Sequence, residues 1–180
     1  MIKKNFLYYS LIPIFFTLLY FINKKKRIMK NIYDKYSEHF KYINPRVKEV
    51  FAKFLNELIN NGYTVTITSS FRTLEKQREL HNINKNNPLY SYHNFGLAID
   101  IVLAKIENNK TIILTKNNKA DWINRGIDKI ASKYNLVWGG NFPNYIDCVH
   151  FDARNYINKM PSELYLIAQN KSIENTPYLV

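Results

Sequence analysis

The stretch from residue 97 to residue 115, LAIDIVLAKIENNKTIILT, indicates how the chain folds. Its first part, LAIDIVLAKI, is largely apolar and rich in β-branched residues, which predicts a core strand. ENNK is polar and predicts a turn, and TIILT, residues 111–115, predicts a second strand. Two strands joined by so short a turn predict a β-hairpin, and therefore an antiparallel sheet.

A helix is predicted upstream of this hairpin, beginning at Pro45. Asn44 suits the N-cap position, proline is favoured in the first helical turn, and Gly62 suits the position just past the helix end. Between them, apolar residues recur three and four positions apart, as on one buried face of a helix: Val47, Val50, Phe51, Phe54, Leu55, Leu58 and Ile59.

The other predicted elements are a half-buried strand at 63–70, helices at 74–81 and 119–134, and short strands at 136–140 and 148–152. Helices and strands in this irregular order, together with a hairpin, favour an α+β fold with a small antiparallel sheet and flanking helices. The length of 180 residues suits one domain with a short appended segment.

The N-terminal segment is different in character. Residues 6–22 are largely apolar and lie between two lysines and KKKR at 24–27. At about 1.5 Å per residue this segment just spans a bilayer core, so it predicts a transmembrane anchor, with a cleaved export signal as the alternative. Because KKKR follows the span, the positive-inside rule would place the rest of the chain in the cytoplasm.

The basic charge is concentrated in the first 30 residues, which hold seven Lys or Arg and no acidic residue. The rest of the chain holds 19 Lys or Arg against 14 Asp or Glu, so the formal net charge of +12 belongs mostly to the N-terminus. We therefore expect no nucleic-acid partner. The single cysteine, Cys148, excludes an intramolecular disulfide and a multi-cysteine metal site, and we expect it to be packed.

Three residues suggest a metal site. His93 lies seven positions before Asp100, which sits among apolar residues of the predicted hairpin, and His150 begins the last predicted strand. If these strands are neighbours, two imidazoles and one carboxylate meet and leave a fourth position for water, as in catalytic zinc sites. Taken alone, His93 is better explained as a structural histidine, but a buried Asp100 needs a charged or hydrogen-bonded partner.

A zinc hydrolase also needs a base and a donor for the developing oxyanion. Asp147 is the candidate base, and since strand alternation would separate it from His150, it must lie in the loop before that strand. The alternative is a carboxylate that merely ends a loop. Arg72, close to Ser69 and Ser70 where a strand runs into a helix, suits the donor, although alone it is equally a surface arginine.

These segments, in this order, resemble the zinc-dependent D,D-carboxypeptidases and L-alanyl-D-glutamate endopeptidases of peptidase family M15, including its endolysin-like branch. SSFRTLEKQ (69–77) is similar to the first motif of the family, and SYHNFGLAID (91–100) fits the metal motif S-x-H-x-x-G-x-A-x-D. DCVHF (147–151) resembles the last motif, and WGGNF (138–142) is similar to the W-G-G-D-W stretch of the endopeptidase branch. The resemblance covers roughly residues 44–155.

The resemblance implies an α+β fold shared with hedgehog domains and one zinc ion per chain. It implies Asp147 as general base and Arg72 as a substrate contact, to which we add the neighbouring Ser70 as a substrate-binding residue. The implied zinc ligands are His93, Asp100 and His150. Asn141 and Phe142 replace an aspartate and a tryptophan of the family, which leaves the bond that is cleaved open.

The expected function is hydrolysis of peptidoglycan stem peptides at the cell wall, first at the L-alanyl-D-glutamate bond. The alternatives are a D-Ala-D-Ala carboxypeptidase and a zinc-binding recognition module without activity, against which Asp147 argues. The expected partners are the stem peptide and, through residues 6–22, the membrane; nothing indicates an oligomer. We divide the chain into a membrane anchor or signal (1–27), a linker (28–43) and a zinc peptidase domain (44–180).

Overall fold

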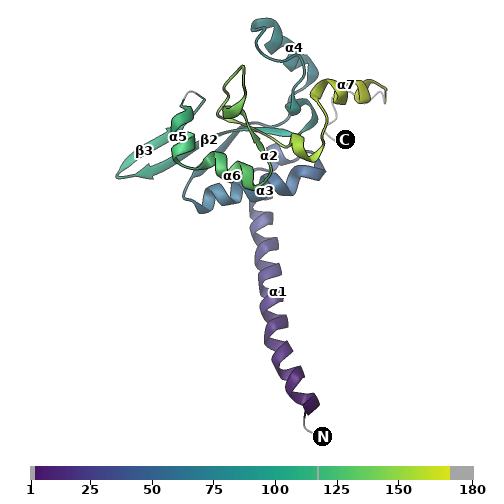
Figure 1. Cartoon of the computed structure of the whole chain (residues 1–180), viewed down its shortest axis with the longest axis vertical. Helices are drawn as coiled ribbons and strands as arrows, with labels where there is room; N and C mark the ends of the chain where they lie inside the picture. Colours follow the sequence, from purple (N-terminus) through teal and green to yellow (C-terminus); the bar gives the residue numbers. More distant parts are fainter. Residues whose placement is uncertain (1–2, 117, 171–180) are drawn as a thin grey trace.

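The computed structural model describes residues 3–116 and 118–170, with the side chains of residues 3–15 and of residue 170 excepted. Helices surround a five-stranded sheet, and one long helix extends away from the rest (Figure 1). Every strand pair in the sheet is antiparallel. The predicted α+β fold with a small antiparallel sheet and flanking helices is therefore confirmed.

The sheet is built around strand β2. The strands are β1 (Thr64–Ser69), β2 (Ala98–Glu107), β3 (Lys110–Leu114), β4 (Val137–Trp138) and β5 (His150–Asp152). Their order is β1-β2-β5-β4, and β3 pairs with the second half of β2 as the predicted hairpin. Asn108 and Asn109 both have positive φ, 51° and 60°, as a two-residue hairpin turn requires.

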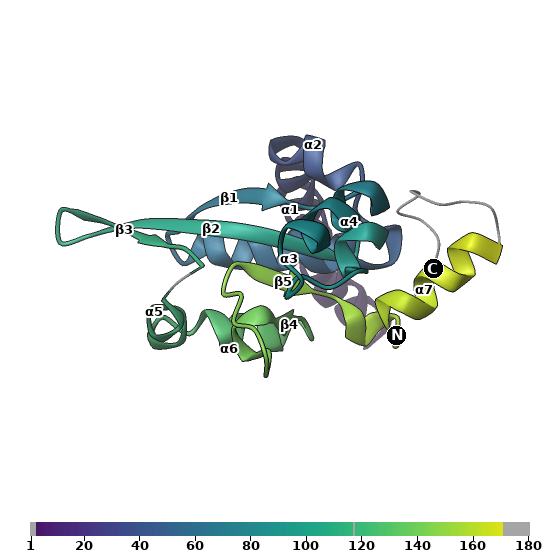
Figure 2. The same ribbon diagram turned by 90° about the horizontal axis from the view of Figure 1, so that it is seen from above.

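The helices are α1 (Lys3–Lys35), α2 (Ser37–Phe40), α3 (Pro45–Asn60), α4 (Leu74–Ile83), α5 (Lys119–Asn124), α6 (Ile127–Lys133) and α7 (Pro161–Asn170). Short 3-10 turns are η1 (Tyr92–Phe95), η2 (Gly139–Asn141) and η3 (Arg154–Tyr156). Helix α4 and helix α7 lie toward the same end of the sheet, away from the β2–β3 hairpin tip (Figure 2).

Helix α3 forms as the sequence predicts and covers one face of the sheet. The Asn44 side chain accepts a hydrogen bond from the backbone N–H of Arg46, and Gly62 has the positive φ of a chain leaving a helix. Phe54 packs against Phe151 of β5 with ring centroids 4.8 Å apart. The fully buried positions on this face are Val47, Phe51, Ala52, Phe54, Leu55 and Leu58.

The helix predicted at 119–134 is in fact two helices. Gly126, between α5 and α6, has φ 70°, a left-handed conformation that ends one helix before the next begins. The apolar spacing continues across this break, with Trp122 and Ile127 both fully buried. For this reason the pattern alone did not separate the two helices.

The segment expected to be a linker, residues 28–43, is mostly helical and packs against the core. The Tyr36 hydroxyl donates a hydrogen bond of 3.0 Å to the carbonyl oxygen of Val65 in β1. Four of its side chains are buried: Ile32, Tyr36, Phe40 and Ile43. The end of α1 and helix α2 therefore contribute to the core of the folded part.

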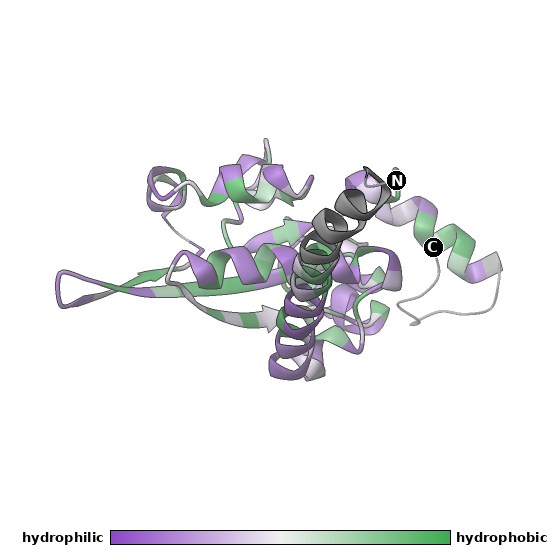
Figure 3. Ribbon diagram, turned by 90° about the horizontal axis from the view of Figure 1, so that it is seen from below, coloured by the Kyte–Doolittle hydropathy of each residue, from purple (hydrophilic) through white to green (hydrophobic). Residues whose placement is uncertain are grey.

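The predicted transmembrane segment is not supported. In the part of the chain that the structure describes, no helix is long and apolar enough to cross a membrane. Much of the expected segment falls on residues 3–15, whose side chains lie outside the described part. From residue 16 onward the apolar run is soon interrupted by KKKR at 24–27, and hydrophilic residues gather where α1 nears the body (Figure 3).

Candidate metal centre and active site

Strand pairing brings the predicted metal ligands together. Asp100 in β2 lies directly opposite His150 in β5. His93 lies in η1, which precedes β2, and Gly96 with φ 63° turns the chain from this 3-10 turn into the strand. The Ser91 side chain accepts a hydrogen bond from the backbone N–H of His93 and so caps the turn.

The three side chains form a small triangle of donor atoms. His93 Nε2 lies 3.0 Å from Asp100 Oδ1 and 3.1 Å from His150 Nδ1, and His150 Nδ1 lies 3.0 Å from the same Asp100 oxygen. Zinc bonds of 2.0–2.1 Å in a tetrahedron would separate their ligand atoms by about 3.3 Å. The spacing and the chemistry of this set therefore fit a zinc ion with one open position.

The outer nitrogen of each imidazole has its own acceptor. His93 Nδ1 donates to the backbone carbonyl of Ser70 at 2.8 Å, because a carbonyl can only accept. His150 Nε2 lies 3.3 Å from Asp152 Oδ2 on the side away from the triangle. These contacts leave His93 Nε2 and His150 Nδ1 with their lone pairs toward the metal position.

The electrostatics of the triangle favour charged groups in the absence of a metal. Burial would raise the pKa of Asp100, but the neighbouring His93 and His150 hold this pKa well below its usual range. Burial would lower the pKa of His150, but Asp100 and Asp152 together raise it to about 9. His150 therefore lies between two carboxylates, Asp100 at its Nδ1 and Asp152 at its Nε2, that both favour its charged form.

Asp147 lies in the loop before β5, as its predicted role requires. Its backbone N–H donates to the carbonyl oxygen of Gly139, and its Oδ2 lies 4.0 Å from Lys116 Nζ. Its Oδ1 is buried and has no hydrogen-bond partner among the described residues. Asp147 lines the same cavity as the three candidate ligands, and a carboxylate there is suited to accept a proton from a water.

Arg72 reaches the same place from the loop after β1. Its Nη1 donates a 2.8 Å hydrogen bond to Gln77 Oε1, and its Nη2 lies 3.7 Å from Asp100 Oδ2. Its backbone N–H donates to the carbonyl of His93. These contacts fix the guanidinium at the edge of the triangle.

Ser70, which we expected to bind substrate, points elsewhere. Its hydroxyl contacts His39 Nδ1 at 3.2 Å, and its carbonyl receives the hydrogen bond from His93. Ser70 is buried and is not among the residues that line the cavity. The structure thus gives it a supporting position behind His93.

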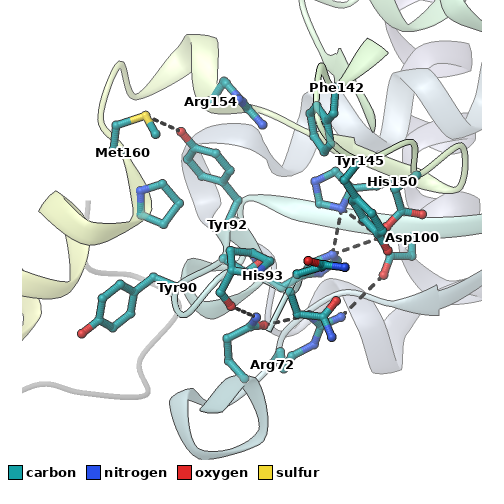
Figure 4. A pocket seen from close by; sticks show the side chains of 17 residues that line it. Arg72, Tyr90, Tyr92, His93, Asp100, Phe142, Tyr145, His150, Arg154 and Met160 are labelled. Carbon is teal, nitrogen blue, oxygen red and sulfur yellow. Dashed lines mark hydrogen bonds and ion pairs between the residues drawn. The ribbon is translucent and has the colours of Figure 1, made fainter. Parts of the chain in front are cut away.

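A cavity of about 340 Å³ opens in front of the triangle (Figure 4). Both Arg72 and Asp147 line it, together with the three candidate ligands. Aromatic and amide side chains form most of the remaining wall: Asn86, Asn87, Tyr90, Tyr92, Phe142 and Tyr145. This shape and lining suit an extended peptide with polar groups.

Three further residues of the site were not predicted. Asp152 follows His150 by two positions in β5, so strand alternation places both on one face and could have identified it. Arg154 binds both oxygens of Asp152, with distances of 2.7 and 2.6 Å. Gln77 binds Arg72 through contacts that no local pattern reveals.

Cys148, in contrast, is fully buried as expected, and burial raises the pKa of its thiol.

Comparison with known proteins identifies the family. A family model described as D-alanyl-D-alanine carboxypeptidase, of the M15 peptidases, matches residues 84–153. The peptidoglycan L-alanyl-D-glutamate endopeptidase CwlK of Bacillus subtilis (strain 168) is 30% identical over 123 residues, which cover 61% of this chain and 72% of that protein. The chain belongs to the M15 peptidase family. It is therefore an enzyme of this peptidase class, as the motifs predict.

Two other M15-like proteins are similar to the chain. The L-alanyl-D-glutamate peptidase of Listeria phage A118 is 30% identical over 117 residues, or 61% of this chain, and the match spans only 38% of the phage protein. The crystal structure of Serratia marcescens L-Ala D-Glu endopeptidase ChiX has a TM-score of 0.48 and 18% sequence identity, and the match covers 67% of this chain and 88% of that one.

Proposed function

We propose that the chain is a zinc metallopeptidase that hydrolyses the L-alanyl-D-glutamate bond of peptidoglycan stem peptides. The observation that carries this proposal is the triangle of His93, Asp100 and His150, with 3.0–3.1 Å between its donor atoms, at the base of a peptide-sized cavity. Two relatives whose names state this bond support the choice of substrate.

In this proposal the triangle holds one zinc ion, which would polarise the scissile carbonyl and make a bound water more acidic. The carboxylate of Asp147, which lines the cavity, accepts the proton of the attacking water and passes it to the leaving amine. Arg72 donates hydrogen bonds to the carbonyl oxygen as negative charge develops on it. Asp152 keeps the proton of His150 on Nε2, so that Nδ1 stays free as a ligand.

The proposal is tested by digestion of purified peptidoglycan, with mass spectrometry of the products and measurement of bound zinc. Asp147→Asn should retain one zinc per chain and lose hydrolysis by a factor on the order of 100 or more. Asp128→Asn is the matched control, because Asp128 Oδ1 is also buried without a partner but lies on α6, outside the cavity. Full hydrolysis by Asp147→Asn would rule out this base.

A D-Ala-D-Ala carboxypeptidase is the second candidate, favoured by the description of the matching family model. The two activities release different products from the same stem peptide. A free terminal D-alanine indicates the carboxypeptidase, and a new amino-terminal glutamate indicates the endopeptidase. A recognition module without activity would give neither product.

Either activity requires the enzyme to act at the cell wall, outside the cytoplasmic membrane. Export or anchoring through residues 6–22 stays a prediction from the sequence. Protease digestion of intact cells and spheroplasts would test it, because an exported enzyme is degraded without lysis of the cells.

A further inference from the structure

A second guanidinium lines the cavity, and the proposed mechanism does not use it. Arg154, in η3 just after β5, has a side chain that is 32% exposed. Its guanidinium carbon lies 4.8 Å from the ring centroid of Tyr92 and 5.1 Å from that of Phe142. Figure 4 shows the guanidinium between these two rings, on the cavity side.

Arg154 has hydrogen-bond donors to spare. Its Nε and Nη2 bind the two oxygens of Asp152. A guanidinium has five N–H donors, so Nη1 keeps two of them, for which the described residues provide no acceptor within hydrogen-bond distance. If Arg154 served only to neutralise the buried Asp152, these remaining donors and their access to the cavity would have no use.

The position of Arg154 relative to the metal site is defined by Asp152. A single oxygen, Asp152 Oδ2, lies 2.6 Å from Arg154 Nη2 and 3.3 Å from His150 Nε2. The guanidinium is therefore separated from a candidate metal ligand by one carboxylate. Arg72 lies next to a different candidate ligand, Asp100. The two guanidinium groups therefore flank the triangle at different ligands, Arg72 at Asp100 and Arg154 near His150.

The proposed substrate has a group that matches this position. In an L-alanyl-D-glutamate bond the α-carboxyl group of glutamate is attached to the carbon next to the scissile nitrogen. It therefore lies within one residue length, about 3.5 Å, of the bond that is cleaved. With zinc bound, the two guanidinium groups and the divalent ion would carry four positive charges, against three negative charges on Asp100 and Asp147 in the cavity and on Asp152 buried behind it, which favours an anionic substrate.

We propose that Arg154 is a specificity-determining residue that binds the free α-carboxylate of the glutamate on the leaving side of the scissile bond. This inference rests on the proposed function. Tyr92 and Phe142 hold the guanidinium plane, and Asp152 orients it, so that Nη1 donates to the carboxylate. A stem peptide with an α-carboxamide at this position lacks the charge and is a poor substrate.

The experiment compares two stem peptides that differ only in an α-carboxylate or an α-carboxamide on the D-glutamate. The zinc-loaded protein should cleave the carboxylate form with kcat/KM at least about 10-fold higher, because charge-assisted hydrogen bonds are the stronger ones. Arg154→Gln should reduce this ratio to within about 2-fold. Arg125→Gln is the matched control, because Arg125 also binds both oxygens of a carboxylate, that of Glu107, but does not line the cavity.

Equal cleavage of both peptides by the unchanged protein, or an unchanged preference in Arg154→Gln, would overturn the inference. If Arg154→Gln does not fold, Arg154→Lys keeps the charge that Asp152 needs and should still weaken the preference, since lysine cannot bind both carboxylates in the same geometry. If the zinc-loaded protein cleaves neither peptide, the proposed function itself fails, and this inference with it.

Discussion

Gly139 lies under the loop that carries Asp147, and its lack of a side chain keeps this loop close to the metal site. A Cβ at this position would lie 2.4 Å from the backbone oxygen of Asp147 and 3.0 Å from His150 Cβ. Both neighbours belong to the site, and one of them is backbone. The first glycine of the WGG motif is thus explained by the space that the proposed base and one candidate ligand need.

Gly139→Ala should therefore displace Asp147 and His150. We expect a loss of about 1–3 kcal/mol in the free energy of unfolding, together with weaker zinc binding and much lower hydrolysis. Chemical denaturation and zinc titration measure these effects. Gly126→Ala is the control: its positive φ makes alanine strained, but no atom lies within 4 Å of the new Cβ. It should lose stability and keep zinc affinity, so equal zinc affinities in the two variants would contradict this account.

Helix α4 connects Arg72 to one wall of the cavity. Gln77, almost fully buried on this helix, accepts a hydrogen bond from Arg72 and donates a 2.6 Å hydrogen bond to the carbonyl oxygen of Pro88. His81 Nδ1 donates to the carbonyl of Asn87, one residue earlier in the same wall. The helix therefore positions both the guanidinium and the loop before η1.

Gln77→Leu should release both of these partners without touching the metal ligands. We expect kcat/KM to fall by about 10-fold or more, with one zinc per chain retained and a stability loss of about 1–3 kcal/mol from the unpaired polar groups. Kinetics and zinc analysis measure this. Gln169→Leu, on helix α7 and bonded to Tyr165 outside the cavity, is the matched control. Unchanged kinetics would show that Arg72 does not depend on Gln77.

Elements determined by local patterns could be predicted from the sequence, and those determined by long-range contacts could not. The hairpin and the cap at Asn44 follow from neighbouring residues, and the structure has them. The candidate ligand set was predictable because three ordered motifs contain it. The supporting position of Ser70 depends on His39 and His93, which lie 31 and 23 positions away in the sequence. The contacts of Gln77 depend on how the loops carrying Arg72 and Pro88 fold back on helix α4, so no periodic pattern indicates them.

At the scale of the molecule, a half-buried glutamate joins helix α3 to the end of α6 and to the tyrosine that follows it. Glu57 Oε2 accepts hydrogen bonds of 2.6 Å from Lys133 Nζ and from the Tyr134 hydroxyl. Burial and the neighbouring Glu57 raise the pKa of Tyr134 to about 12. This contact between distant segments should affect the stability of the whole fold.

The raised pKa of Tyr134 predicts a loss of stability in alkali. An unfolded tyrosine ionises near pH 10, so the stabilising effect is fully present below pH 10 and is lost as the pH rises toward 12. The free energy of unfolding, measured by urea denaturation, should therefore fall over this range. Tyr134→Phe should show a smaller decrease than the unchanged protein. The same slope in both proteins would contradict the raised pKa.

Removal of the metal should also affect the whole molecule. The proposed zinc ion binds the folded chain, so a chelator should lower the unfolding temperature, and added zinc should restore it. At free zinc about 1,000 times the dissociation constant, the stabilisation is about 4 kcal/mol. Calorimetry with and without chelator measures this. His93→Ala should respond much less, and an equal response would argue against the ligand set.

The pairing of β2 with β5 has one more consequence. Asp100 and His150 are 50 positions apart in the chain, yet a single ion would touch both. Such an ion acts as a reversible cross-link that closes a loop containing the hairpin and helices α5 and α6, much as a disulfide would in a chain that has only one cysteine. Unlike a disulfide, this cross-link opens and closes with the zinc concentration, so the resistance of the enzyme to unfolding would follow the zinc supply of its surroundings.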